Sequence, residues 1–242
     1  MQFQALDEKG PVSAKRALKG KNYLCQECLA PVRLRGGLRR QLHFFHLTGS
    51  SCKQHQKGAI HLHLQAHLAH LLPGAVLEQP FPQIGRIADL FCKDSKRIFE
   101  VQVSPISEQE VQERTRHYES LGYSVVWILH EKRFNKRQLS AAELFLSQKC
   151  RYFSNMDASG QGMIYDQLEE LYGSRRERRG KKLPVDLRRP FSSEQKGLYH
   201  AGDVTHLGLP FPALKKSVGR AWLKTLYWRL FFLLLRKLGL CK

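Results

Sequence analysis

The chain has 242 residues, a net charge of +19, a pI near 9.9 and 42% hydrophobic residues. The hydrophobic content can fill a core, which excludes a wholly disordered basic tail. The excess of positive charge predicts an acidic partner, either a nucleic acid or an anionic membrane surface. No run of eighteen apolar residues occurs, which argues against an ordinary transmembrane helix.

The N-terminal sequence and the cysteines predict where the protein works. The first ten residues, MQFQALDEKG, contain acidic residues and lack the apolar stretch of a secretory signal. Three of the six cysteines lie between Cys25 and Cys52, which is not typical of a disulfide framework. Reduced cysteines favour a cytoplasmic protein.

The charge is distributed unevenly along the chain. Residues 1–60 carry eleven Lys and Arg against three acidic residues, and residues 212–242 carry eight basic residues and no acidic one. The middle, residues 75–131, is slightly acidic, with six basic and nine acidic residues. It also has the most regular secondary-structure signals, so we expect a folded core with basic flanks.

Three regions follow from this pattern. We expect an N-terminal zinc-binding region over 1–55, a core over 56–135 and a basic, mostly helical C-terminal region over 136–242. Glycines, prolines and eight basic residues between about 173 and 190 predict a basic linker inside the last region.

Five residues of metal-ligating types, three cysteines and two histidines, gather near the N-terminus. Cys25 and Cys28 have the spacing at which two thiolates reach one zinc ion. The intervening PVRLRGGLRR predicts a short hairpin that brings these two cysteines to the later ligands. His43, His46 and Cys52 compete for the other two positions, and the alternative is buried free thiols with surface histidines. A zinc ion here would be structural, since the segment has few apolar residues of its own.

The core begins with a helix followed by three strands. Apolar residues recur at helical spacing over 58–72 and end at Pro73-Gly74. Strands are predicted over 75–79, 85–92 and 97–104 by their alternation of apolar and polar residues.

Two carboxylates lie on neighbouring predicted strands. Asp89 shares a strand face with apolar residues, and Glu100 projects beside Gln102 from the third strand. An Asp and a Glu aimed from adjacent strands suit Mg²⁺, which takes carboxylate oxygens, waters and phosphate. The alternative is a pair of carboxylates in salt bridges with Arg86 or Arg114.

A second helix and a fourth strand complete the core. Ser107 and Glu110 form a capping box for a helix that ends at Gly122. The apolar run VVWIL over 125–129 is typical of a buried parallel strand. The predicted order is therefore αβββαβ, an α/β (α+β) fold with a right-handed crossover.

These motifs resemble one protein family. The CxxC of Cys25 and Cys28, the HFFH of His43–His46, and then RIAD, FEVQVS, ERTRHY and VVWIL resemble the CoiA-like competence proteins. The resemblance covers about residues 20–135. It implies a nuclease-like core of the PD-(D/E)xK type behind a zinc-binding N-terminal domain, in a protein that aids natural transformation.

The resemblance also assigns roles to residues of the core. Asp89 and Glu100 match the metal-binding acidic pair, and Gln102 stands where the wider nuclease superfamily usually has lysine. His61 matches a histidine of the first helix. The chain departs from the family at Lys57 and Gln65, where relatives tend to show an acidic residue and a lysine.

A nuclease mechanism follows if the site is active. Asp89 and Glu100 would hold Mg²⁺ (or Mn²⁺) against the scissile phosphate, and the metal would lower the pKa of an attacking water. Gln102 can orient that water but supplies no positive charge, and His61 could carry a proton. A catalytically silent DNA-binding scaffold on the same fold is the alternative.

Basic residues predict the contacts to DNA. They comprise Arg114 and Arg116 on the second helix and Arg175, Arg176, Arg178 and Arg179 in the predicted linker. The aromatic, leucine-rich and basic segment 222–240 predicts a helix that docks on a protein surface, with a membrane-surface anchor and base stacking as alternatives. The predicted partners are single- or double-stranded DNA and, with it, recombination or DNA-uptake proteins.

Overall fold

The computed structural model describes residues 1–37, 40–49, 52 and 57–188. The predictions for the segment 222–240, and for the rest of 189–242, therefore lie outside the described residues. Within the described part of the chain, no helix is long and apolar enough to cross a membrane.

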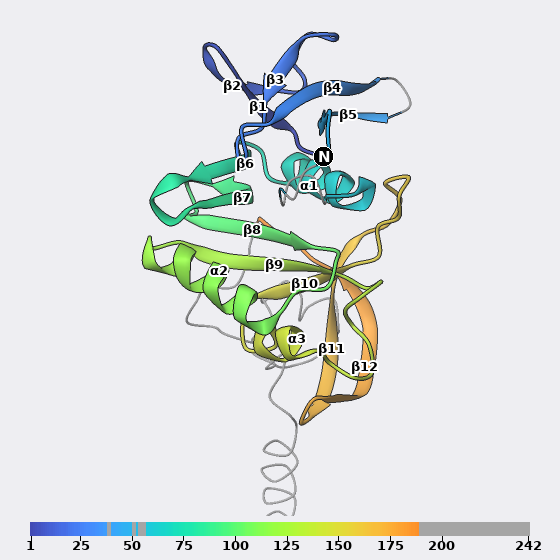
Figure 1. Ribbon diagram of the computed structural model, residues 1–242. Helices are drawn as coiled ribbons and strands as arrows, with labels where there is room; N and C mark the ends of the chain where they lie inside the picture. Colours follow the sequence, from blue (N-terminus) through green and yellow to red (C-terminus); the bar gives the residue numbers. More distant parts are fainter. Residues whose placement is uncertain (38–39, 50–51, 53–56, 189–242) are drawn as a thin grey trace, which may run out of the picture.

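The N-terminal region is a five-stranded antiparallel sheet with its own small core (Figure 1). Its strands, in the spatial order β2-β1-β3-β4-β5, are β1 (Gln4–Asp7), β2 (Gly10–Ser13), β3 (Asn22–Leu24), β4 (Pro31–Gly37) and β5 (Arg40–His46). The predicted hairpin is β4 and β5, and a register shift in it falls at Gly36. Gly36 has φ 119°, and a Cβ there would lie 2.6 Å from the Gln41 carbonyl oxygen, so only glycine fits this bulge.

The second sheet has seven strands in the order β12-β11-β10-β9-β8-β7-β6. Its first four strands in chain order are β6 (Val76–Phe81), β7 (Arg86–Cys92), β8 (Arg97–Gln102) and β9 (Ser124–His130), with the short helix η2 (Pro82–Ile84) between β6 and β7. The helices are α1 (Ala59–Leu71), α2 (Glu108–Ser120) and α3 (Ala141–Leu146). The predicted order αβββαβ is confirmed by α1, β6, β7, β8, α2 and β9.

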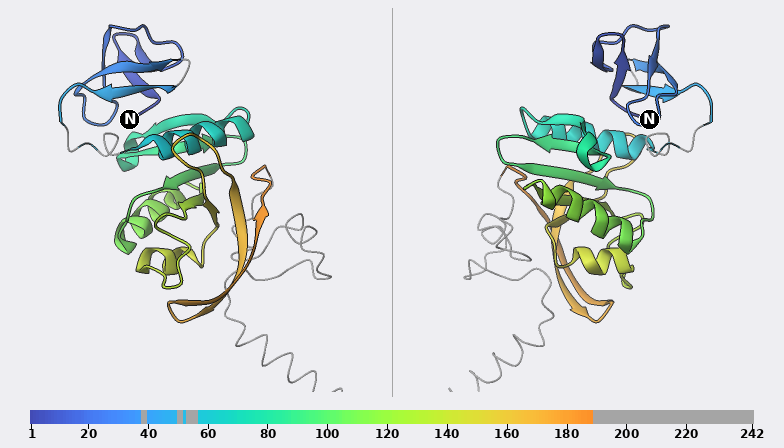
Figure 2. Two further views of the ribbon diagram at one scale, coloured as in Figure 1. Left: turned by 90° about the vertical axis from the view of Figure 1, so that its right-hand side faces the viewer. Right: turned by 60° about the vertical axis from the view of Figure 1, so that its left-hand side comes forward.

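Helices cover both faces of this sheet because successive strand residues point to opposite sides. Leu64 and Leu68 of α1 pack in one core cluster with Phe99 of β8, whereas Val111 of α2 packs with Trp127 of β9 in another. Figure 2 shows α1 and α2 on opposite sides of the strands.

Local signals fix the crossover from β8 to β9. The hydroxyl of Ser107 accepts the backbone N–H of Glu110 at 3.1 Å, so the predicted cap of α2 is confirmed. Gly122 follows the helix with φ 78°, a left-handed conformation that glycine adopts without steric cost. The strands β8 and β9 are parallel, as the apolar run predicted.

Over its described residues, 136–188, the C-terminal region extends the sheet. The described residues 136–188 form α3 and three strands, β10 (Arg151–Ser154), β11 (Ile164–Tyr172) and β12 (Arg175–Pro184), so they are not mostly helical. The predicted basic linker over 173–190 is wrong over 175–184, where β12 pairs with β11 in the long hairpin of Figure 1. The composition of this segment, rich in basic residues with glycine and proline, did not predict a strand, because the stability of β12 depends on its pairing with β11.

Candidate functional site

The cysteines and one histidine of the N-terminal region converge as a metal-site prediction requires. The ligand atoms of Cys25, Cys28, His46 and Cys52 all lie within 4.8 Å of one another. Cys28 Sγ is 3.3 Å from His46 Nε2, and Cys25 Sγ is 3.7 Å from Cys52 Sγ. Sulfur and imidazole ligands in a group of four are typical of structural zinc.

Strand geometry decides between the two candidate histidines. His43 and His46 both lie on β5 but are three residues apart, so they point to opposite faces of the sheet. His46 points to the cysteines, while His43 Nδ1 lies 2.7 Å from the carbonyl oxygen of Gln41. His46 is therefore the zinc candidate, and His43 is not part of the cluster.

The second site is a pocket of about 810 Å³ in the core. Asp89 and Glu100 line it from β7 and β8, and both side chains are buried. The two strands pair from Leu90 to Cys92, just beyond Asp89. At Asp89 a side-chain hydrogen bond joins the two strands, because the carboxylate oxygen Oδ2 accepts the backbone N–H of Val101 at 2.8 Å.

Three side chains contact the other oxygen of Asp89. Lys57 Nζ lies 2.8 Å, Gln65 Nε2 2.9 Å and His61 Nε2 3.0 Å from Oδ1. Burial alone would favour the protonated acid, but His61 and then Lys57 lower the pKa of Asp89 well below its ordinary range. Asp89 is therefore ionised at neutral pH.

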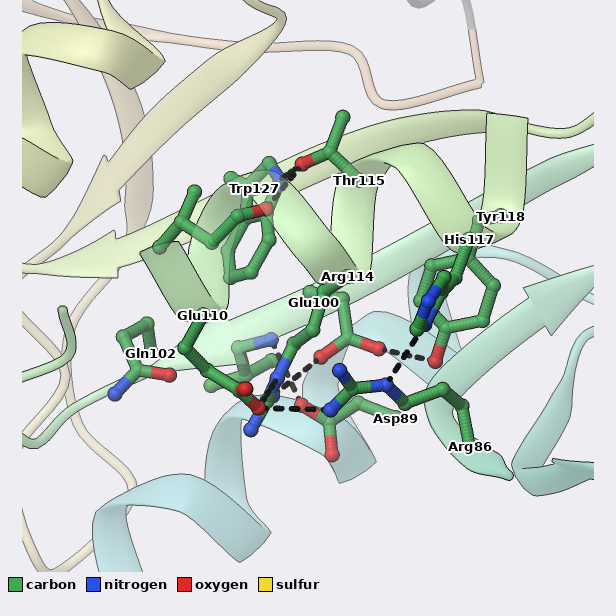
Figure 3. Close-up of polar contacts among 12 residues, drawn as sticks. Arg86, Asp89, Glu100, Gln102, Glu110, Arg114, Thr115, His117, Tyr118 and Trp127 are labelled. Carbon is green, nitrogen blue, oxygen red and sulfur yellow. Dashed lines mark hydrogen bonds and ion pairs between the residues drawn. The ribbon is translucent and has the colours of Figure 1, made fainter. Parts of the chain in front are cut away.

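Glu100 is held by the second helix of the core (Figure 3). The Tyr118 hydroxyl donates to Oε1 at 2.9 Å, and Arg114 Nη1 donates to Oε2 at 3.1 Å. Burial, and next the nearby charge of Asp89, raise the pKa of Glu100 to about 7. Glu100 is therefore a buried carboxylate whose charge is disfavoured by its surroundings and offset in part by Arg114.

Helix α2 explains the ERTRHY motif. Arg114 also donates to Glu110 Oε1 at 2.8 Å, and Arg86 donates to the same oxygen at 2.8 Å (Figure 3). Thr115 is buried, where its hydroxyl accepts the indole N–H of Trp127 at 3.2 Å. The motif thus combines one fixed arginine and one tyrosine at the carboxylates with a threonine that joins the helix to β9.

Gln102 lines the same pocket, and its side-chain amide nitrogen points to Ser104, just beyond the end of β8. Its Nε2 donates to the Ser104 carbonyl at 2.7 Å and to the Ser104 hydroxyl at 3.2 Å. The amide is therefore held in one orientation, which leaves its oxygen as the group available to a water molecule.

The predicted DNA-binding arginines divide into accessible and buried ones. Arg116 on α2 and Arg175 and Arg179 on β12 are exposed, and Arg178 is a β12 residue. Arg176 is wrong as a surface contact, because it is 2% exposed and ion-paired to Glu143 and Glu169. A charged side chain is buried only where it has such partners. The alternation of residues along β12 does not identify Glu143 and Glu169 as the partners of Arg176, because they lie on other elements.

Two basic residues that the sequence analysis did not select as site residues, Lys132 and Arg133, line the pocket. Lys132 and Arg133 lie in the turn two and three residues after the end of β9, are exposed and line the pocket with Arg114. They could have been predicted from their position after the carboxyl end of a parallel strand, because ligands of open α/β sheets bind at that end.

Comparisons with known families agree with this arrangement. A family model described as "Competence protein CoiA, N-terminal domain" matches residues 7–55, and one described as "Competence protein CoiA, nuclease-like domain" matches residues 52–169. Together they cover more than half of the chain. No curated protein and no solved structure matches it significantly.

Proposed function

The chain belongs to the CoiA family of competence proteins, and from this premise we propose that it is a metal-dependent DNA nuclease acting in DNA uptake and recombination. The observation that carries the proposal is the convergence of Asp89 and Glu100 in a pocket whose lining also holds five basic side chains, beside the carboxylates of Glu27 and Glu110. Carboxylates repel a phosphodiester unless a cation stands between them, so their presence among phosphate-binding groups favours metal-assisted chemistry.

The residues of the pocket fit a divalent cation by the chemistry of their donors. Asp89 and Glu100 offer hard carboxylate oxygens, which Mg²⁺ and Mn²⁺ prefer. Burial and Asp89 raise the pKa of Glu100, and a bound cation would relieve that cost. A metal bound here would polarise a phosphate oxygen and lower the pKa of an attacking water.

The chain's own side chains orient the reactants. Arg114, fixed by Glu100 and Glu110, presents a guanidinium to the pocket, where it can bind a phosphate oxygen. The oxygen of Gln102, whose amide nitrogen is held by Ser104, can accept a hydrogen bond from the attacking water. His61 holds Asp89 through Nε2, so its first role is to orient that carboxylate.

In this proposal, Lys132 and Arg133 bind the phosphates of the DNA backbone. Both are exposed at the pocket and lie next to β9, on the side where Arg114 also opens to the pocket. Contacts of this type bind any sequence and weaken with salt.

A cleavage assay tests the proposal. The full-length protein is incubated with single- and double-stranded DNA in Mg²⁺ or Mn²⁺, together with Glu100→Gln and with Glu108→Gln, an exposed glutamate of α2 that serves as the matched control. We expect Glu100→Gln to lose at least a hundredfold in cleavage rate while DNA affinity changes little. Equal cutting by Glu100→Gln and the wild type would refute the assignment.

A catalytically silent DNA-binding protein is the second candidate. The ion pair between Lys57 and Asp89 supports it, because Asp89 already has a cationic partner. This candidate predicts DNA binding that falls when Lys132 and Arg133 are replaced by methionine, and no cleavage with either metal. Cleavage that is lost in Glu100→Gln would exclude it.

A further inference from the structure

Lys57 lies inside the pocket, between two carboxylates from different strands. Its Nζ is 2.8 Å from Asp89 Oδ1 and 3.3 Å from Glu78 Oε1, and its side chain is 11% exposed. We propose that Lys57 is a built-in counter-cation that a divalent metal ion must displace from Asp89, so that this lysine sets the metal affinity of the site. The inference rests on the proposed function in that it concerns the same carboxylates.

The hydrogen-bonding capacity of Asp89 is already used. A carboxylate offers about four lone-pair positions, and Asp89 accepts from Lys57, His61, Gln65 and the backbone of Val101. A metal ion can bind Asp89 only if one of these donors leaves.

Lys57 is the donor that has to leave. The N–H of Val101 is fixed in β8, Gln65 is neutral, and the imidazole of His61 is held on a short side chain of helix α1. The ammonium of Lys57 is a full charge on a flexible stem at the same oxygen, and two cations a few ångströms apart repel each other strongly in a buried site.

Glu78 gives the displaced ammonium a place to stay. This residue of β6 is buried, and Oε2 accepts the backbone N–H groups of Phe3 and Gln4 at 2.7 and 2.9 Å. It has φ 51°, which a non-glycine residue adopts only where its surroundings enforce it. Glu78 is thus fixed by the N-terminal strand and keeps its other oxygen for Lys57.

The test measures metal binding without DNA. Mn²⁺ is titrated into full-length, zinc-loaded protein, and free Mn²⁺ is followed by electron paramagnetic resonance. We expect Lys57→Met to bind Mn²⁺ at least tenfold more tightly than the wild type. Lys93→Met removes the same charge from the exposed turn between β7 and β8 and should leave the affinity unchanged. Unchanged or weaker binding by Lys57→Met would overturn the proposal.

Two further variants keep the test decisive. Lys57→Gln removes the charge but keeps a donor for Asp89, so it serves if Lys57→Met does not fold, and it should also tighten Mn²⁺ binding. The double variant Lys57→Met with Asp89→Asn should bind no more tightly than Asp89→Asn alone. Tight binding by the double variant would show that the gained site does not involve Asp89, and would contradict the inference.

The outcomes separate this inference from the proposed nuclease. Tighter Mn²⁺ binding by Lys57→Met in a protein that cuts no DNA keeps the inference and refutes the nuclease. DNA cleavage by the wild type with equal Mn²⁺ affinities in both proteins keeps the nuclease and refutes the inference.

Discussion

The two candidate metal sites of this protein differ in how their ligands are balanced. In the N-terminal cluster the candidate ligand atoms lie close to one another, and the side chains of Gln2 and Glu27 lie beside them. In the core pocket, Asp89 and Glu100 each have a cationic partner, Lys57 and Arg114. A metal in the core pocket therefore has to compete with these two cations, whereas the four candidate ligands of the cysteine cluster lie together around one position.

Substitution of a zinc ligand in the cysteine cluster should destabilise the protein the most. We expect His46→Ala to abolish stoichiometric zinc binding and to unfold the N-terminal sheet, because structural zinc contributes on the order of 10 kcal/mol in small domains. His43→Ala, three residues earlier on the same strand, should keep its zinc. Elemental analysis and circular dichroism measure both. Loss of zinc in both variants would contradict the assignment by strand face.

A purely structural ion-pair cluster provides the next contrast. Glu143, Glu169, Arg151 and Arg176 are buried together, away from the pocket-lining residues. Replacing Arg176 by methionine leaves two buried carboxylates short of a partner, and we expect a loss of about 3–5 kcal/mol in the free energy of unfolding. Exposed Arg179 should cost about 0.5 kcal/mol or less when replaced by methionine. Urea denaturation measures the free energy of unfolding of both variants. Similar losses in the two variants would contradict the prediction that the buried ion pairs of Arg176 stabilise the fold.

The raised pKa of Glu100 predicts a pH dependence of stability. The native state binds a proton more tightly than the unfolded state, because burial and then Asp89 raise the Glu100 pKa to about 7. Its contribution is complete below the unfolded pKa near 4.5 and is lost as the pH rises toward 7. Without divalent metal, we expect a loss on the order of 2–3 kcal/mol between pH 5 and pH 8.

Glu100→Gln tests the origin of that slope. Glutamine does not ionise, so the free energy of unfolding of this variant should change less between pH 5 and pH 8 than that of the wild type. Chemical denaturation at both pH values measures the difference. An identical slope in both proteins would assign the pH dependence to other groups.

The smallest expected effect concerns Tyr118. Its hydroxyl donates to Glu100, so Tyr118→Phe removes one hydrogen bond to a buried carboxylate at almost constant volume. We expect a loss of about 1–2 kcal/mol at pH 8, where Glu100 is ionised, and less at pH 5. Equal losses at the two pH values would show that the hydroxyl does not respond to the charge of Glu100.

Local patterns in the amino-acid sequence predicted the elements of the core and placed Asp89 and Glu100 on adjacent strands. Apolar spacing, the Ser107 cap and the run VVWIL are local patterns, and they predicted α1, α2 and the parallel β8–β9 pair. The spacing of Cys25 and Cys28 is equally local, and so it pointed to a metal cluster before any fold was known.

The partners that surround these groups depend on how the elements pack in three dimensions. His46 rather than His43 lies at the cysteines because the pairing of β5 with β4 brings that face of the strand to them, and Arg176 is buried because β12 pairs with β11. The contact between Lys57 and Asp89 joins residues 32 positions apart from a loop and a strand. Sequence periodicity reports which face a side chain takes within its own element. Contacts between elements follow from how the sheets and helices pack, and in this protein they determine how the buried charges are neutralised.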